Sequence, residues 1–401
     1  MVELAIHGGV PVREKKKSTY PHISNEAKVE VMKALDMGYL ARFYGGVYVH
    51  QFEKEYARHF NREYGIAVNS GTAALHIAYL GAELPLFSEV LVPANCYISA
   101  ISALIQCHLI PVVVDIDPTS WVMDPEDIRR KITPRTSAIV PVHMYGQPCP
   151  MDEIMEIANE HNLKVIEDCG QSHGALWNGK VTGTFGIAAC YSICCRKHVS
   201  AGEGGVVISD SKRLSELGHA YTHKGKGEGW FDYFYMGYSY NMTELQAILG
   251  IHSLRGLPEE LARRQNFAVF VQQQLGGLEL EFPVVPENST HAYFKFNFLV
   301  PKRLAKYRNE ITDAIRKENL GADPAHPYVL EIPWLQKQEP VLYHLQEVKV
   351  RPKYDLNSCP VARDVMARQI GLELGPGLNI DDMEDTVKAV RKVMTWYLKN
   401  K

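Results

Sequence analysis

Short apolar segments alternate with amphipathic helical patterns through the first half of this 401-residue chain. Strand-like segments are expected at residues 65–68, 89–92, 110–117, 137–141, 165–166, 187–195 and 206–208. Helical patterns between them cover residues 23–37, 49–60, 73–81, 98–107, 125–132 and 151–161. Strands and helices that alternate at this spacing form a mostly parallel sheet with right-handed crossovers. The sequence therefore predicts an α/β domain.

The pattern changes after residue 255. The elements expected there are a long helix, a proline-containing loop, a strand and two further helices, at residues 258–270, 283–290, 291–300, 308–318 and 383–398. This order is typical of a small α+β domain. We expect a large domain over residues 14–255, a small C-terminal domain over residues 256–401, and an N-terminal arm at residues 1–13.

Composition excludes several classes of protein. The formal net charge of −3 offers no basic surface for nucleic acid. No apolar stretch reaches the ~18 residues of a membrane span, and the N-terminus lacks a secretion signal, so we expect a cytoplasmic protein. Cys190, Cys194 and Cys195 lie in an apolar run and are expected to be buried free thiols. Asp115 and Asp117 are expected to be structural, and no metal site is predicted.

Two of the predicted strands each lead to an ionisable residue. Asp168 follows Val165 and Ile166, and Lys197 follows the apolar run around Tyr191. Ligands bind at the carboxyl ends of strands in an open α/β sheet, so both groups are expected at one site. Pyridoxal 5′-phosphate requires a lysine that forms an imine and an acid that keeps the pyridine nitrogen protonated. Lys197 and Asp168 are therefore candidates for these roles.

Two motifs in fixed order carry a resemblance to a known family. They are an Asp-x-x-Gln-x-x-Gly segment at residues 168–174 and a lysine, Lys197, five residues before Gly-Glu-Gly-Gly at residues 202–205. The chain resembles the DegT/DnrJ/EryC1/StrS aminotransferases over nearly its whole length. The resemblance implies a homodimer with the fold-type I, aspartate-aminotransferase-like architecture. It also implies an enzyme that uses pyridoxal phosphate to move an amino group from glutamate or glutamine to a keto-sugar, often nucleotide-linked, or a keto-cyclitol. The expected setting is amino-sugar, aminocyclitol or antibiotic biosynthesis.

The resemblance also implies the catalytic residues. Lys197 is expected to hold the cofactor as an imine and to carry the proton during transfer, and Asp168 to contact the ring nitrogen. Similar sugar dehydratases have a histidine at the lysine position, and here the histidine is the next residue, His198. His173 either supports the cofactor contacts from behind or belongs to the core.

Further residues match positions that bind the cofactor in the family. Gln171 is expected to touch the phenolic oxygen, and Tyr97 to stack on the ring. Ser192 falls at the phosphate-binding serine, five residues before the lysine, while Gly71 and Thr72 provide donors at a predicted helix start. A capped turn without a ligand is the alternative for Gly71 and Thr72, and ordinary core packing is the alternative for Tyr97.

The segment at residues 236–244 matches a family motif that reaches the cofactor phosphate of the neighbouring subunit. Ser239 and Asn241 stand where the family usually has Asn and Arg, and Asn241 is our candidate for the phosphate contact. An apolar helix at residues 245–254 follows this polar loop. A closed two-fold dimer that buries this helix would give each active site residues from two chains.

Two other readings stay open. One is a dehydrating enzyme that uses pyridoxal phosphate, either a sugar dehydratase or an enzyme like aminohydroxybenzoate synthase. The other is a regulatory protein that has kept the fold, against which the intact Lys197 and Asp168 argue. The acceptor is expected to bind between loops near Phe43, residues 224–231 and residues 324–334, whose composition does not encode one ligand.

Overall fold

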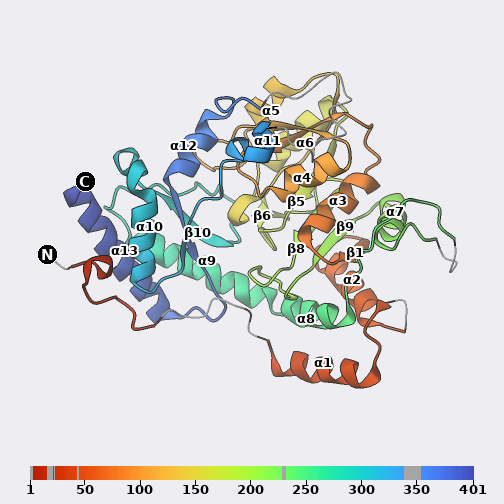
Figure 1. The fold of residues 1–401 in the computed structure, drawn as a ribbon, viewed down its shortest axis with the longest axis horizontal. Coiled ribbons are helices and arrows are strands. Elements are labelled where there is room, and N and C mark those ends of the chain that lie inside the picture. The colour runs from red at the N-terminus through yellow and green to blue at the C-terminus, as the bar shows by residue number, and fades with distance from the viewer. Residues whose placement is uncertain (1–2, 16–20, 22, 43–44, 228–231, 338–353) are drawn as a thin grey trace.

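A computed structural model describes residues 3–15, 21, 23–42, 45–227, 232–337 and 354–401 (Figure 1). Its largest element is a seven-stranded sheet in the order β1-β9-β8-β5-β4-β2-β3. Strand β9 is antiparallel to β1 and β8, and the other pairs are parallel. The strands are β1 (Tyr64–Val68), β2 (Glu89–Pro93), β3 (Ile110–Val114), β4 (Thr136–Ile139), β5 (Lys164–Asp168), β8 (Ala188–Ser192) and β9 (Gly205–Ser209).

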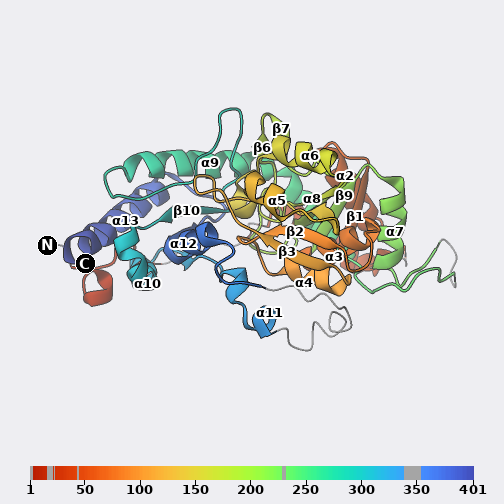
Figure 2. The same ribbon diagram turned by 90° about the horizontal axis from the view of Figure 1, so that it is seen from above.

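Helices cover both faces of this sheet, and Figure 2 shows α3 and α4 on one side and α6 on the other. Alternate residues of β2 are buried on the two sides, with Val90 and Val92 in the cluster of α3 and α4 and Leu91 in that of α6. Strands buried on both faces are almost wholly apolar, which explains the sequence pattern. The helices are α1 (Asn25–Met37), α2 (Tyr48–His59), α3 (Gly71–Gly81), α4 (Ser99–Gln106), α5 (Pro125–Lys131), α6 (Met151–Glu160), α7 (Lys212–Thr222) and α8 (Glu244–Arg255).

The C-terminal part of the chain is built on a three-stranded antiparallel sheet in the order β10-β12-β11. A second core of apolar residues lies between this sheet and the long helices α9 and α13. The described elements are α9 (Leu257–Gln274), β10 (Lys295–Leu299), α10 (Arg308–Lys317), β11 (Ala322–Pro324), α11 (Pro333–Lys337), α12 (Pro360–Arg368), β12 (Gln369–Glu373) and α13 (Ile380–Asn400). A short hairpin of β6 (Leu176–Trp177) and β7 (Lys180–Val181) lies outside both sheets.

Part of the C-terminal half packs against the large sheet. Tyr328, Leu330 and Cys359 belong to the same core cluster as β2 and α4. Asp115, at the end of β3, accepts the backbone N–H groups of the first turn of α12 at 2.8 and 3.0 Å. This confirms a structural role for Asp115. The division of the chain at residue 256 into a large and a small domain stays a prediction.

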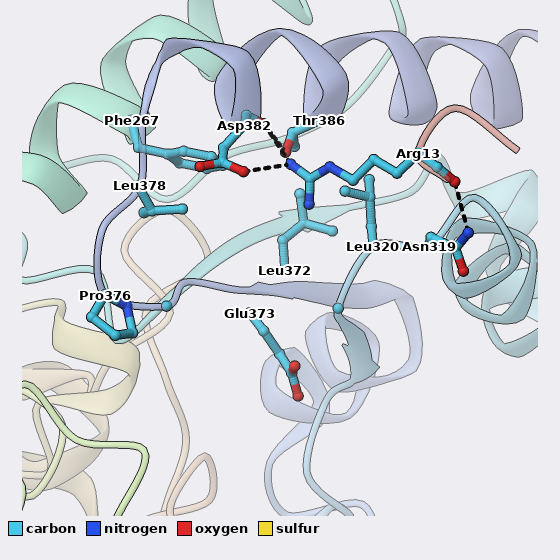
Figure 3. Close-up of a pocket in the computed structure, with 12 residues that line it drawn as sticks. Arg13, Phe267, Asn319, Leu320, Leu372, Glu373, Pro376, Leu378, Asp382 and Thr386 are labelled. Atoms are coloured by element: carbon cyan, nitrogen blue, oxygen red, sulfur yellow. Dashed lines mark hydrogen bonds and ion pairs between the residues drawn. The ribbon is translucent and has the colours of Figure 1, made fainter. Parts of the chain in front are cut away.

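The N-terminal residues pack on the second core. Leu4 is fully buried there, and the backbone N–H groups of Ala5 and Val12 donate to the buried carboxylate of Glu318 at 3.0 and 2.9 Å. Arg13 pairs with Asp382 of α13 at 3.3 Å (Figure 3). The cavity beside Arg13 measures about 30 Å³, which suits one or two water molecules but no substrate. These contacts hold residues 4–13 against the C-terminal part.

Within the described residues, no helix combines the length and the apolar character needed to cross a lipid bilayer. The longest, α13, carries charged residues from its first turn to its last, and α9 carries them in its first half. Helices of this kind pack one apolar stripe on a core and leave the other face to water.

Candidate functional site

The start of α3 and the end of β8 form a cup lined by polar groups. Ser70 caps the helix, and its Oγ accepts the N–H of Ala73 at 3.1 Å. The N–H groups of Gly71 and Thr72, in the first turn, have no carbonyl partner inside the helix. A Cβ atom on Gly71 would lie 2.6 Å from the Cβ of Ser192, so only glycine allows this close approach. The amide groups at this helix start, together with the hydroxyls of Thr72 and Ser192, form a site suited to a phosphate.

Asp168 lies at the end of β5, on the strand next to the one that carries Ser192. Its Oδ1 accepts the N–H of Gly170 at 3.0 Å. Burial raises the pKa of Asp168, and the Gly170 N–H and the charge of Lys197 offset this only in part. A buried carboxylate of this kind is stabilised by a cationic partner. The protonated nitrogen of a pyridine ring would be such a partner.

Lys197 faces the same site from the loop between β8 and β9. Its Nζ lies 4.3 Å from the centre of the Phe294 ring. Burial lowers the pKa of Lys197, while nearby Asp168 opposes this and Lys295 adds to it. A lysine with a lowered pKa holds more of the neutral amine that attacks carbonyl carbon. The structure thus brings together the two residues that the sequence predicts to be catalytic.

The expected strand at residues 187–195 is too long. Strand β8 ends at Ser192, and the chain then turns, with the N–H of Lys197 donating to the carbonyl of Cys194 at 2.9 Å. Cys195 is exposed and Cys194 is partly buried, so the expectation that both are buried is wrong. Hydrogen bonds of Ile193 with Gly204 and Ala201 hold this turn. Lys197 then lies close enough to Asp168 for their charges to interact.

Gln171 and Tyr97 are linked through Tyr145 and His326. The side-chain oxygen of Gln171 accepts the N–H of Tyr145 at 2.9 Å, which leaves its NH₂ group as a donor. The ring of Tyr97 is 51% exposed and meets the edge of His326 at a centroid distance of 5.5 Å. His326 in turn stacks on Tyr145, with the two ring planes 3° apart. The ring of Tyr97 and the NH₂ group of Gln171 could therefore contact a flat aromatic ligand.

Asn241 lies outside the cup of its own chain. Ser192 pairs with Gly205, Gly205 with Val68, and Val68 with Asn241. Three strand spacings of ~4.8 Å place Asn241 roughly 14 Å from Ser192. Its side chain contacts His223 at 3.2 Å. The contact between Asn241 and a phosphate of the neighbouring subunit stays a prediction, and this distance from the cup of the same chain is compatible with it.

The histidine that follows Lys197 points into the core. His198 is 4% exposed, and its Nε2 meets the carbonyl of Ala292 at 2.9 Å. His173 is fully buried beside it, among Tyr56, Tyr191 and other rings. Among the described residues, neither ring nitrogen of His173 has a hydrogen-bond partner. His173 is thus a core residue, and His198 does not occupy the lysine position of the site.

The sequence analysis did not identify a buried cluster next to Asp168, which is formed by Glu167 and His143. The carboxylate of Glu167 accepts the N–H groups of Gly183, Phe185 and Gly186 at 2.6 to 2.8 Å and meets His143 at 3.2 Å. Burial opposes ionisation, but these hydrogen bonds hold the pKa of Glu167 below its usual value. Cys169, His143 and Glu167 lie close enough together that their side chains could in principle ligate a metal ion. These four partners already account for the carboxylate, so hydrogen bonding explains this cluster.

Comparison with known proteins decides the family. The sequence profile of the DegT/DnrJ/EryC1/StrS aminotransferase family matches residues 21–391. The chain belongs to the DegT/DnrJ/EryC1/StrS aminotransferase family. It is an aminotransferase with the fold-type I α/β architecture, as the sequence predicts. The aminotransferase reading is the one that the family match supports.

Relatives within the DegT/DnrJ/EryC1/StrS family match most of the chain. GDP-perosamine synthase from Caulobacter vibrioides is 31% identical over 320 residues, covering 78% of this chain and 85% of that protein. A putative L-glutamine:3-amino-2,3-dideoxy-scyllo-inosose aminotransferase from Streptoalloteichus tenebrarius is 28% identical, covering 79% of each. The crystal structure of an aminotransferase from Psychrobacter cryohalolentis superimposes with a TM-score of 0.83 at 29% identity, covering 94% of this chain and 98% of that chain.

The residues present fit pyridoxal phosphate, the cofactor expected for the DegT/DnrJ/EryC1/StrS aminotransferases. The tight approach of Gly71 to Ser192 provides the phosphate cup, and the buried carboxylate of Asp168 matches a cationic ring nitrogen. Lys197, with a pKa lowered by burial, matches an imine-forming amine. Each part of the cofactor therefore has a chemically suitable group in this chain.

The sequence analysis did not identify the residues that close the site from the C-terminal half. His326 and Lys295 both lie near enough to Lys197 to influence its charge or be influenced by it. The expected acceptor loop at residues 324–334 includes His326, which lies at the rim, but Leu330 and Leu335 are buried in the core. Phe43 and residues 228–231 lie outside the described residues.

Proposed function

We propose that this aminotransferase uses pyridoxal 5′-phosphate to transfer an amino group from glutamate or glutamine to a keto-sugar or keto-cyclitol. The observation that carries the proposal is the meeting of Lys197, Asp168 and the cup of Gly71 and Ser192 at the carboxyl ends of β5 and β8. The names of the two relatives, one acting on a sugar and one on an amino-inosose, support this class of acceptor. The setting we infer is amino-sugar or aminocyclitol biosynthesis, including antibiotic pathways.

The residues of the site divide the work between binding and proton transfer. When bound, pyridoxal phosphate supplies a reactive carbonyl and a ring that withdraws electrons. The carboxylate of Asp168 stabilises positive charge on the ring nitrogen, and its burial strengthens this effect. Lys197 would supply the amine that holds the cofactor and the group that carries a proton during transfer. Ser192, Gly71 and Thr72 bind the phosphate.

Absorption spectra test the proposed reaction. We expect the purified protein to be yellow with pyridoxal phosphate and to lose that colour when glutamate or glutamine is added, because the amino group moves to the cofactor. A keto-sugar or keto-cyclitol from a panel should then restore the colour and appear as an amine by mass spectrometry.

Each alternative outcome would indicate a different function for this protein. A yellow protein that leaves both donors unchanged and releases a dehydrated sugar would be a dehydratase. A protein that binds no cofactor would be a regulatory protein with this fold. In the expected case, omission of the keto substrate serves as the control, since the colour should then stay lost.

We further propose that the active enzyme is a homodimer with shared sites. Besides the position of Asn241, two surfaces support a second chain. Helix α1 packs on α8 and leaves Val29 and Met32 more than half exposed (Figure 1). Described residues that follow α7 extend from the body of the molecule (Figures 1 and 2). Among them, Phe234 and Met236 are 70% and 86% exposed. Apolar surfaces of this kind mark protein interfaces.

Mixing two inactive variants tests the shared site. We expect Lys197→Ala and Asn241→Asp to be inactive alone and to regain roughly a quarter of wild-type activity after subunit exchange, since one site of each mixed dimer is intact. Steady-state transfer rates measure the effect, and two affinity tags confirm the mixed dimers. Proven mixed dimers without activity would contradict the model, as would a fully active monomer.

The thiols support a cytoplasmic location, which we also propose. All eight cysteines lie within the described residues and are free. Six of them are buried, which suits a reducing compartment where disulfides do not form.

A further inference from the structure

A buried lysine of the small sheet lies beside the catalytic lysine. Lys295 begins β10 and is 8% exposed. Its long side chain passes over Gly371 of the neighbouring strand, where a Cβ atom would lie 3.2 Å from the Cδ of Lys295. Its ammonium group reaches Asp323 of β11 on the far side at 2.7 Å. The absence of a side chain at Gly371 therefore opens the path of Lys295 across the sheet.

A second cation meets Lys295 at this carboxylate. Arg196, the residue before Lys197, lies 3.9 Å from the same Oδ2 atom of Asp323 that Lys295 contacts. Arg196 also pairs with Glu373 at 3.1 Å. Figure 3 shows the carboxylate of Glu373 pointing away from Arg13. Two cations thus converge beside Lys197, each held by a carboxylate of the small sheet.

Stability alone gives little reason for this arrangement. A buried ion pair contributes little net stability because desolvation offsets the attraction between the charges. Lys295 also lies close enough to Lys197 and His326 to lower the pKa of both. Its charge therefore disfavours the protonated forms of these two neighbours. Asp323 has a further partner in Arg316 at 3.1 Å and does not depend on Lys295 alone. A buried cation directed at a reaction centre is typical of substrate recognition.

We propose that Lys295, assisted by Arg196, binds the carboxylate of the amino-acid donor, and that Asp323 and Glu373 hold the two cations until the donor arrives. The inference rests on the proposed function, because it assigns the donor to the site of Lys197. The donor's carboxylate takes the place of Asp323 as the partner of Lys295. A keto-sugar or keto-cyclitol acceptor without an anionic group at this point does not use the pair.

Binding of glutarate to the holoenzyme tests this role. Glutarate has the carbon chain of glutamate without the amine, so it binds without reacting. We expect Lys295→Met to raise the dissociation constant of glutarate about tenfold or more, the usual cost of one charged hydrogen bond. We expect Asp323→Asn to leave it unchanged or lower it, because the competing carboxylate is gone. Isothermal titration calorimetry measures both.

The opposite changes in glutarate affinity expected for Lys295→Met and Asp323→Asn distinguish a donor-binding role from a purely structural one. A purely structural pair would lose stability in both variants and weaken glutarate equally, which would overturn the proposal. So would unchanged affinity in Lys295→Met. Lys302→Met, a substitution at an exposed position, is the matched control and should bind glutarate as the wild-type protein does. If Lys295→Met is insoluble, Lys295→Gln takes its place with the same expected result.

Donor-dependent loss of colour keeps the two proposals distinct. If the wild-type enzyme is not bleached by glutamate or glutamine, the proposed function fails. If it is bleached and Lys295→Met has the same donor dependence, only the role of Lys295 fails. We expect the variant to need a higher donor concentration for the same bleaching rate, with the acceptor half-reaction unaffected.

Discussion

Replacing Lys197 by alanine is expected to abolish amine transfer. Among the described residues around Asp168, Lys197 is the amine with a lowered pKa that faces the ring of Phe294 at the site. Alanine can neither form an imine with the cofactor nor carry a proton, so both functions are lost together. Transfer rates with the best donor and acceptor measure the effect, and the variant should still fold, since the loop is held by backbone hydrogen bonds.

Chemical labelling checks the same residue independently. Reduction with borohydride should leave the cofactor covalently attached to Lys197 in the wild-type protein, as found by peptide mapping. A label on Lys180 or Lys224 would contradict the assignment. Lys180→Ala is the matched control, because Lys180 is exposed on the β6–β7 hairpin and should retain full activity.

Replacing Asp168 by asparagine is expected to slow the reaction ~10²-fold or more while some cofactor still binds. Asparagine is nearly the same size as aspartate but carries no charge, so it cannot stabilise positive charge on the ring nitrogen. Burial makes the loss large, because water does not screen the carboxylate. The rate at which glutamate bleaches the protein in a single turnover measures it.

Two further measurements interpret the Asp168→Asn result. Bound cofactor, quantified by its absorbance after release, distinguishes a slow enzyme from an empty one. The surface variant Glu153→Gln keeps the change from carboxylate to amide but lies outside the site, and it should react at the wild-type rate. Near-normal turnover with an unchanged spectrum in Asp168→Asn would rule out the role given to the carboxylate.

Local patterns predicted most of the large sheet. Helix α6 lies within one residue of the expected limits, and strand β5 extends the expected residues 165–166 by one residue before and two after. Both were predictable because their apolar residues coincide with buried positions. The end of β8 was not predictable in this way. Residues 193–195 are as apolar as the strand itself, and only the hydrogen bonds of Ile193 with Gly204 and Ala201 turn the chain.

Asp168 and Lys197, the proposed catalytic residues, could be picked out from the sequence because each follows a strand directly or within a motif. Lys295 and Asp323 were not, since they come from different strands of the small sheet and meet only across Gly371. Strand β11 has three residues, too few for a periodic pattern to identify it. The support of Asp168 by Glu167 likewise depends on a loop, residues 183–186, whose amide groups carry no sequence signal.

The pairing of Val68 with Asn241 has a second consequence, for solubility. Strand β1 is the last strand on its side of the large sheet, and an uncovered edge strand invites pairing with other molecules. The segment at residues 240–241 covers the end of this edge, with the N–H of Asn69 donating to the carbonyl of Tyr240 at 2.8 Å. Mutations that displace this segment therefore risk aggregation as well as inactivity. Selection would preserve it for two unrelated reasons.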